Sequence, residues 1–80
     1  MSRLELKGAL AERRQKVLEL SIRGKGLIKG IDALLSMAQI KELSEIDVPG
    51  VHSLAADLND VYDRYTVLKR EIAEIDKELE

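Results

Sequence analysis

The chain has no cysteine, tryptophan or phenylalanine, and only one proline. Without cysteine it has no disulfide framework, thiol nucleophile or thiolate metal site, which fits a reducing compartment. Its longest stretches without a charged residue, residues 33–40 and 48–56, are too short for a signal sequence or a membrane-spanning helix. We therefore expect a cytoplasmic protein with no membrane segment.

What remains is typical of helical bundles and coiled coils. Hydrophobic residues make up 45% of the 80 positions and charged residues 35%, while two tyrosines are the only aromatic residues. β-Sheets favour aromatic and β-branched residues, so this composition predicts an all-α fold. A single domain of residues 1–80 also buries little surface on its own, and this favours association with a second chain.

The two halves of the chain carry opposite charges. Residues 1–44 contain nine Lys or Arg and five Asp or Glu, whereas residues 51–80 contain four and eight. This complementarity favours an arrangement in which the two halves lie side by side.

The second half has the clearer periodicity. Apolar residues recur there at alternating spacings of three and four, which is the pattern of a coiled-coil helix. They are Val51, Leu54, Leu58, Val61, Tyr65, Leu68, Ile72, Ile75 and Leu79. We predict a helix over residues 51–79.

The first half repeats this spacing with interruptions and predicts a helix over residues 4–44. Gly24, Gly26 and Gly30 fall inside it, and each interior glycine costs a helix about 1 kcal/mol relative to alanine. Either the helix continues and the glycines admit larger side chains from a partner helix, or it breaks at Gly24–Gly26 and the chain forms three helices.

Residues 45–50 combine acidic, proline and glycine residues and predict the turn of an antiparallel two-helix hairpin. Asp47 can cap a second helix that has Pro49 in its first turn, or Ser53 can cap one that begins at Leu54. A turn at residue 47 or 48 would place residue i near residue 95 − i. Residues 1–14 would then extend beyond the end of the second helix.

Such an overhang predicts a homodimer, in which two hairpins form a helical bundle held chiefly by the first helix. The expected self-association residues are apolar positions of the overhang and others off the main stripe. They are Leu4, Leu6, Leu10, Leu18, Ile22, Ile28 and Leu35.

No motif for chemistry stands out, and we predict neither an enzyme nor a cofactor or metal site. His52 is the only histidine and has no cysteine to join it. Asp57, Asp60 and Asp63 lie within two helical turns, but no further oxygen ligand is evident, so a solvated acidic face is the simpler interpretation. Tyr62 and Tyr65 have the spacing of packing residues.

The leading hypothesis is therefore a non-catalytic helical module that works by self-association or by docking on a helical protein. The alternative is nucleic-acid binding through a basic tract, because clustered cations can contact phosphates. That tract consists of Arg13, Arg14, Lys16, Arg23, Lys25 and Lys29. Its charge also complements the acidic second half, and an intramolecular charge match is the simpler interpretation.

The segment Arg3-Leu-Glu-Leu-Lys at the start, together with the heptad-patterned run from Leu58 to Leu79, resembles small helical proteins encoded in Mu-like prophages. The resemblance covers the overall plan of a basic first helix, an acidic turn and a heptad-patterned tail. It implies a helical hairpin of prophage origin, and it carries over no catalytic or binding residue.

Overall fold

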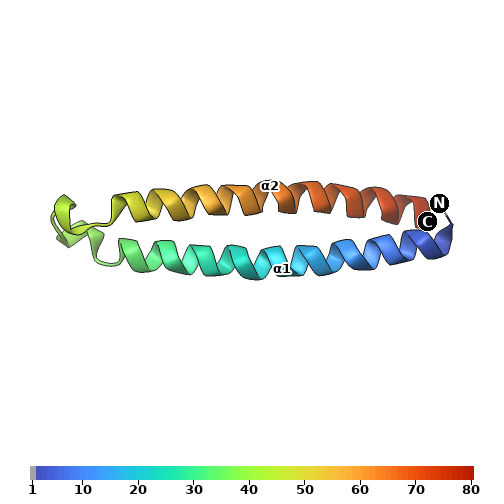
Figure 1. The fold of residues 1–80 in the computed structure, drawn as a ribbon, viewed down its shortest axis with the longest axis horizontal. Helices are drawn as coiled ribbons and strands as arrows, with labels where there is room; N and C mark the ends of the chain where they lie inside the picture. The colour runs from blue at the N-terminus through green and yellow to red at the C-terminus, as the bar shows by residue number, and fades with distance from the viewer. Residues whose placement is uncertain (1) are drawn as a thin grey trace.

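The computed structural model describes residues 2–80, and these form one long antiparallel helical hairpin (Figure 1). Helix α1 spans Arg3–Leu35 and helix α2 spans Val48–Leu79. Two short 3₁₀ helices, Ala38–Ile40 and Leu43–Glu45, lie in the connection. The described chain measures 60 × 15 × 14 Å, and its two ends lie together at one end of the rod. The predicted all-α hairpin is confirmed.

Both long helices begin with a side-chain cap. The Ser2 hydroxyl accepts a hydrogen bond of 3.1 Å from the backbone N–H of Glu5, a pairing of residue types found in capping boxes. At α2, the Asp47 carboxylate accepts a bond of 3.0 Å from the N–H of Gly50, and Pro49 lies in the first turn. Of the two caps that the sequence left open, Asp47 is therefore the one used.

The glycines do not interrupt α1, so the three-helix alternative is wrong. A Cβ atom at Gly24 would lie 3.5 Å from Val61, and one at Gly30 would lie 3.1 Å from a methyl group of Leu54. These two glycines therefore let side chains of α2 approach the backbone of α1 closely. Gly26 has open space around its Cβ position and serves no such purpose.

The connection is longer than predicted and lies earlier in the chain. Helix α1 ends at Leu35 rather than at residue 44, and α2 begins at Val48 rather than at residue 51. After the C-cap Ser36, Met37 adopts a left-handed conformation with φ of 60°. This conformation ends the helix, and glycine is the residue that most often adopts it. Because a methionine holds the position here, the sequence carried no visible stop signal.

The shift of the turn changes the register between the helices. The residue numbers add up to 84 both for Gly30 with Leu54 and for the hydrogen-bonded pair Arg13 and Glu71. Residue i therefore lies near residue 84 − i, about three helical turns away from the predicted 95 − i. Arg3 even donates a hydrogen bond of 3.3 Å to the carbonyl oxygen of Leu79, so the N-terminal segment does not overhang.

The most buried cluster lies at the end of the rod where the two ends of the described chain meet. Leu6 and Leu10 of α1 pack there with Ile72 and Ile75 of α2. The prediction that Leu6 and Leu10 lack an intramolecular partner is therefore wrong. Elsewhere the helices bury less, and no side chain in residues 2–80 falls below 2% exposure.

Candidate interaction face

The two halves of the rod differ in their contacts. The terminal half comprises residues 2–17 and 68–80, and the connecting half comprises residues 18–67. The terminal half contains the cluster around Leu6 and Ile72 and two ion pairs between the helices. In the connecting half, Val61 is the one buried apolar side chain among the described residues, and it packs on Gly24.

The two interhelical ion pairs use the start of the basic tract. Arg13 pairs with Glu71, and Arg14 pairs with Asp76 at 3.5 Å. Lys16 pairs along its own helix with Glu12 at 3.1 Å. This half of the tract is therefore matched to carboxylates of the same chain.

The remaining cations of the tract are Arg23, Lys25 and Lys29. None of them takes part in an ion pair within residues 2–80. All three are exposed. They mark the part of the tract that remains available to a partner.

The ion pair between Arg14 and Asp76 identifies one side of the hairpin. Residues seven apart share a heptad position, so they recur on the same side of a coiled-coil helix. Ile28 follows Arg14 by two heptads and Leu35 by three, and Tyr62 precedes Asp76 by two heptads. Ile28 and Tyr62 therefore lie on the side marked by Arg14 and Asp76, and they face each other across the hairpin in the same way.

This side changes character along the rod. In the terminal half the heptad positions of Ile28 and Tyr62 carry Lys7, Arg14, Lys69 and Asp76, whereas in the connecting half they include Ile28, Leu35, Val48 and Tyr62. These four side chains and Leu18, at the adjacent heptad position, are exposed. We call the set the apolar face, and its members are Leu18, Ile28, Leu35, Val48 and Tyr62. Tyr62, the most exposed of them, has 62% of its surface open to water.

The other predicted self-association residues lie elsewhere. Leu6 and Leu10 are buried within the hairpin, and Leu4 is exposed at the terminal end. Ile22 is exposed and follows Leu18 by one turn, at the outer edge of the apolar face. The sequence thus identified part of the face through α1, but the contributions of Val48 and Tyr62 were not part of that prediction.

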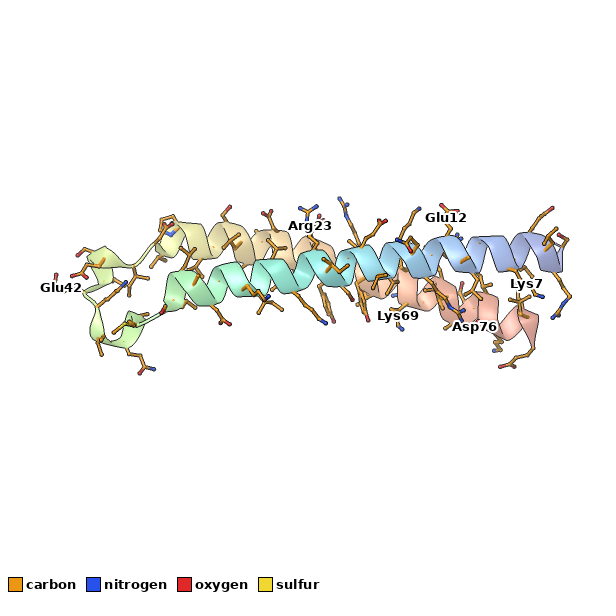
Figure 2. All side chains as sticks on the ribbon, turned by 90° about the horizontal axis from the view of Figure 1, so that it is seen from below. Lys7, Glu12, Arg23, Glu42, Lys69 and Asp76 are labelled. Atoms are coloured by element: carbon orange, nitrogen blue, oxygen red, sulfur yellow. The ribbon has the colours of Figure 1, made fainter. Side chains whose placement is uncertain are left out.

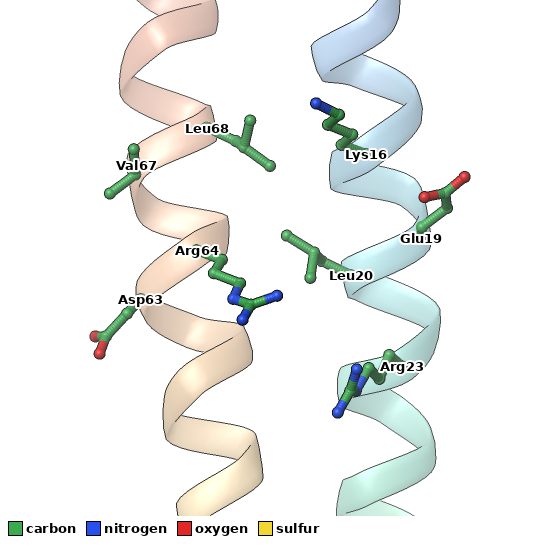
Figure 3. A pocket seen from close by; sticks show the side chains of 8 residues that line it. All are labelled: Lys16, Glu19, Leu20, Arg23, Asp63, Arg64, Val67 and Leu68. Carbon is green, nitrogen blue, oxygen red and sulfur yellow. The ribbon is translucent and has the colours of Figure 1, made fainter.

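The opposite side of the hairpin is charged and carries a shallow open groove of about 670 Å³. In Figure 2, Glu12 and Arg23 project from one side of the rod, whereas Lys69 and Asp76 project from the other. Figure 3 shows Leu20 and Leu68 pointing toward each other across the groove, while Glu19 and Asp63 point away from it. The rest of the lining is Lys16, Arg23, Arg64 and Val67.

The lining of the groove contains neither histidine nor serine, and two of its cations have carboxylate partners, Lys16 with Glu12 and Arg64 with Asp60. Aliphatic side chains between cations are what a coiled-coil edge normally presents.

The sequence candidates for chemistry all lie exposed on α2. His52 is exposed on the first turns of α2, and Asp57, Asp60 and Asp63 are exposed along the same helix. Within residues 2–80, no three His, Cys, Asp or Glu residues are placed to hold a metal ion. In the described part of the chain, neither long helix has a stretch apolar enough to cross a membrane.

Comparisons with protein-family models, with curated proteins and with solved structures found no match to this chain.

Proposed function

We propose that this chain is a non-catalytic helical interaction module that works through the apolar face. The observation that supports the proposal most directly is the set of five exposed large apolar side chains that heptad spacing places on one side of the connecting half. Exposed apolar patches of this kind on small proteins commonly mark interaction sites. The module acts by self-association or by docking of another helix on this face.

The energetic balance favours an association of moderate strength. Burying a Leu, Ile or Val side chain completely contributes roughly 1.5 to 3 kcal/mol, and these side chains are already about half covered, so each gains roughly 1 kcal/mol. Two copies of the five-residue face would gain roughly 10 kcal/mol, against an association cost of about 4 to 15 kcal/mol. We therefore expect dissociation constants in the micromolar range or weaker.

Sedimentation equilibrium on Ile28→Asp tests the proposal, with Leu4→Asp as its matched control. Both changes put a carboxylate at an exposed apolar position of α1, but only Ile28 belongs to the apolar face. We expect the wild type and Leu4→Asp to associate at tens to hundreds of micromolar, and Ile28→Asp to be monomeric with unchanged helicity by circular dichroism. Equal masses for the two variants would contradict a role for this face.

Nucleic-acid binding is the alternative proposal, supported by the three basic residues that lack an intramolecular ion pair: Arg23, Lys25 and Lys29. Binding to phosphates weakens steeply with salt because it releases counterions, whereas apolar packing does not. Titration of DNA and RNA at two salt concentrations therefore distinguishes the two. Salt-sensitive binding lost in a variant with all three residues changed to glutamine would favour the alternative.

The resemblance to Mu-like prophage proteins supports an origin in such an element. That origin remains a proposal, and the genes adjacent to this one would test it.

A further inference from the structure

We infer that the occupant of the apolar face is a second copy of this chain, packed antiparallel and aligned by reciprocal pairs of Lys25 with Asp32. The inference rests on the proposed function, because it requires that the apolar face mediates contact. It adds the identity of the partner and the orientation in which the two copies meet.

Lys25 and Asp32 lie on α1 beside the apolar face. They are seven residues apart and share a heptad position with Leu18, next to Ile28 on the outer edge of the apolar face. Both side chains are exposed, and neither forms an ion pair in the part of the chain that the structure describes. Lys25 and Asp32 thus place one positive and one negative charge at the border of the apolar face, and neither charge is paired within the described hairpin.

The two charges are placed symmetrically along α1. Lys25 and Asp32 lie at equal distances on either side of the point between Ile28 and Lys29. A two-fold axis through that point, perpendicular to the rod, places α1 over α1 of the second copy with opposite direction. Each Lys25 then lies beside an Asp32 of the other copy, which gives two pairs per dimer. Leu18 and Leu35 lie further out along the same surface.

The opposite orientation lacks this match. If both hairpins pointed the same way and packed through the same face, α1 would lie over α2 of the second copy. In the register i near 84 − i, the α2 residue over Lys25 is Asn59 and the one over Asp32 is His52, and neither carries a formal charge at pH 7. Both charges of α1 would then be left at the border of the interface without partners. Charge complementarity therefore selects the antiparallel arrangement.

The extent of the overlap agrees with the division of the hairpin into halves. With the axis near Ile28, the connecting halves of the two copies cover each other, and the terminal halves project from the two ends. The terminal half has its own core around Leu6 and Ile72 and its own interhelical ion pairs. It therefore needs no cover from a second copy.

Charge exchange tests the reciprocal pairing. We expect Lys25→Asp and Asp32→Lys each to weaken self-association roughly tenfold, because each turns two attractive pairs into two repulsive ones. Mixing these two variants should restore wild-type affinity in a heterodimer, in which both pairs are again attractive. Lys77→Asp changes the net charge as Lys25→Asp does, but in the terminal half, and should leave the affinity unchanged. Equal weakening by Lys77→Asp, or no recovery on mixing, would overturn the pairing.

A spin label on Gln15→Cys tests the orientation, and the absence of native cysteine makes the labelling specific. Gln15 is exposed in the terminal half. At a rise of 1.5 Å per residue, the antiparallel dimer separates the two labels by about 40 Å, whereas parallel hairpins bring them within about 25 Å. A dimer that is disrupted by Ile28→Asp but shows the short distance would overturn this inference and leave the proposed function intact. A wild type that stays monomeric at several hundred micromolar would overturn this inference and the self-association form of the proposed function, and would leave docking on another helical protein.

Discussion

Leu6 and Leu10 at the terminal end of the hairpin are 6% and 8% exposed, whereas Leu27, Ile31 and Leu34 in the connecting half remain only partly buried. Both halves follow the same 3,4 spacing of apolar residues. The difference lies in what accompanies it: ion pairs between the helices in one half, and seam glycines with exposed apolar neighbours in the other. The 3,4 spacing of apolar residues therefore specifies that two helices pack together. The residues beside that spacing determine how deeply the apolar side chains are buried.

The largest effect should come from the terminal cluster. Leu10→Ala removes a buried side chain and should lower the free energy of unfolding by about 2 to 4 kcal/mol. Leu27→Ala, at a half-buried position of the connecting half, should cost about half as much. Urea denaturation followed by circular dichroism, at one low protein concentration, measures both. Equal losses would contradict the difference between the halves.

The same contrast sharpens the roles of Leu6 and Leu10. Because both pack against Ile72 and Ile75, replacing them with serine should unfold the hairpin rather than release an intact monomer.

The cap of α2 should come next in size. Asp47→Ala removes the acceptor for the N–H of Gly50 and should cost about 1 kcal/mol. Thermal unfolding measures the loss. Glu45→Ala, a change at an exposed residue that precedes the cap, is the control and should have little effect.

Glycine substitutions in α1 should distinguish required glycines from dispensable ones. Gly26→Ala adds a methyl group in open space and should stabilise the protein by about 1 kcal/mol. Gly30→Ala should gain less, because its Cβ would lie 3.1 Å from Leu54 and that side chain must move. The order of the two melting temperatures checks this prediction, and a reversed order would show that Gly26 has a role outside the single hairpin.

The ion pair of Arg13 with Glu71 should have the smallest effect. About a third of each side chain is exposed, at 31% and 38%, so water screens the attraction. A double-mutant cycle with Arg13→Gln and Glu71→Gln should give a coupling of about 0.5 kcal/mol that falls as salt is added. A coupling that is independent of salt would indicate packing rather than charge.

The sequence predicted the helical hairpin but not its register, and the reasons are local. The stripe from Val51 to Leu79 is unbroken, so α2 could be predicted almost to its ends. The end of α1 could not, because Met37 rather than a glycine adopts the left-handed conformation after Leu35. That one missed boundary shifted the turn, and the shift produced the false overhang of Leu6 and Leu10.

The candidate face was predictable only in part, for a related reason. Exposed apolar residues of α1 such as Leu18 and Ile28 could be recognised off the main stripe from their spacing alone. Their alignment with Tyr62 and Val48 depends on the register between the helices, which heptads leave free to shift by whole turns. In the folded chain that register is defined by the packing of Leu6 and Leu10 on Ile72 and Ile75 and by the close approach of Leu54 to Gly30.

The most direct test of the central claim is a dilution series followed by backbone amide chemical shifts. If the apolar face mediates self-association, amides of residues 18–35 and 48–62 should shift with protein concentration, while those of residues 4–14 and 68–78 stay constant. Ile28→Asp should abolish the concentration dependence. Shifts concentrated in the terminal half, or none up to several hundred micromolar, would contradict the claim that the connecting half mediates self-association.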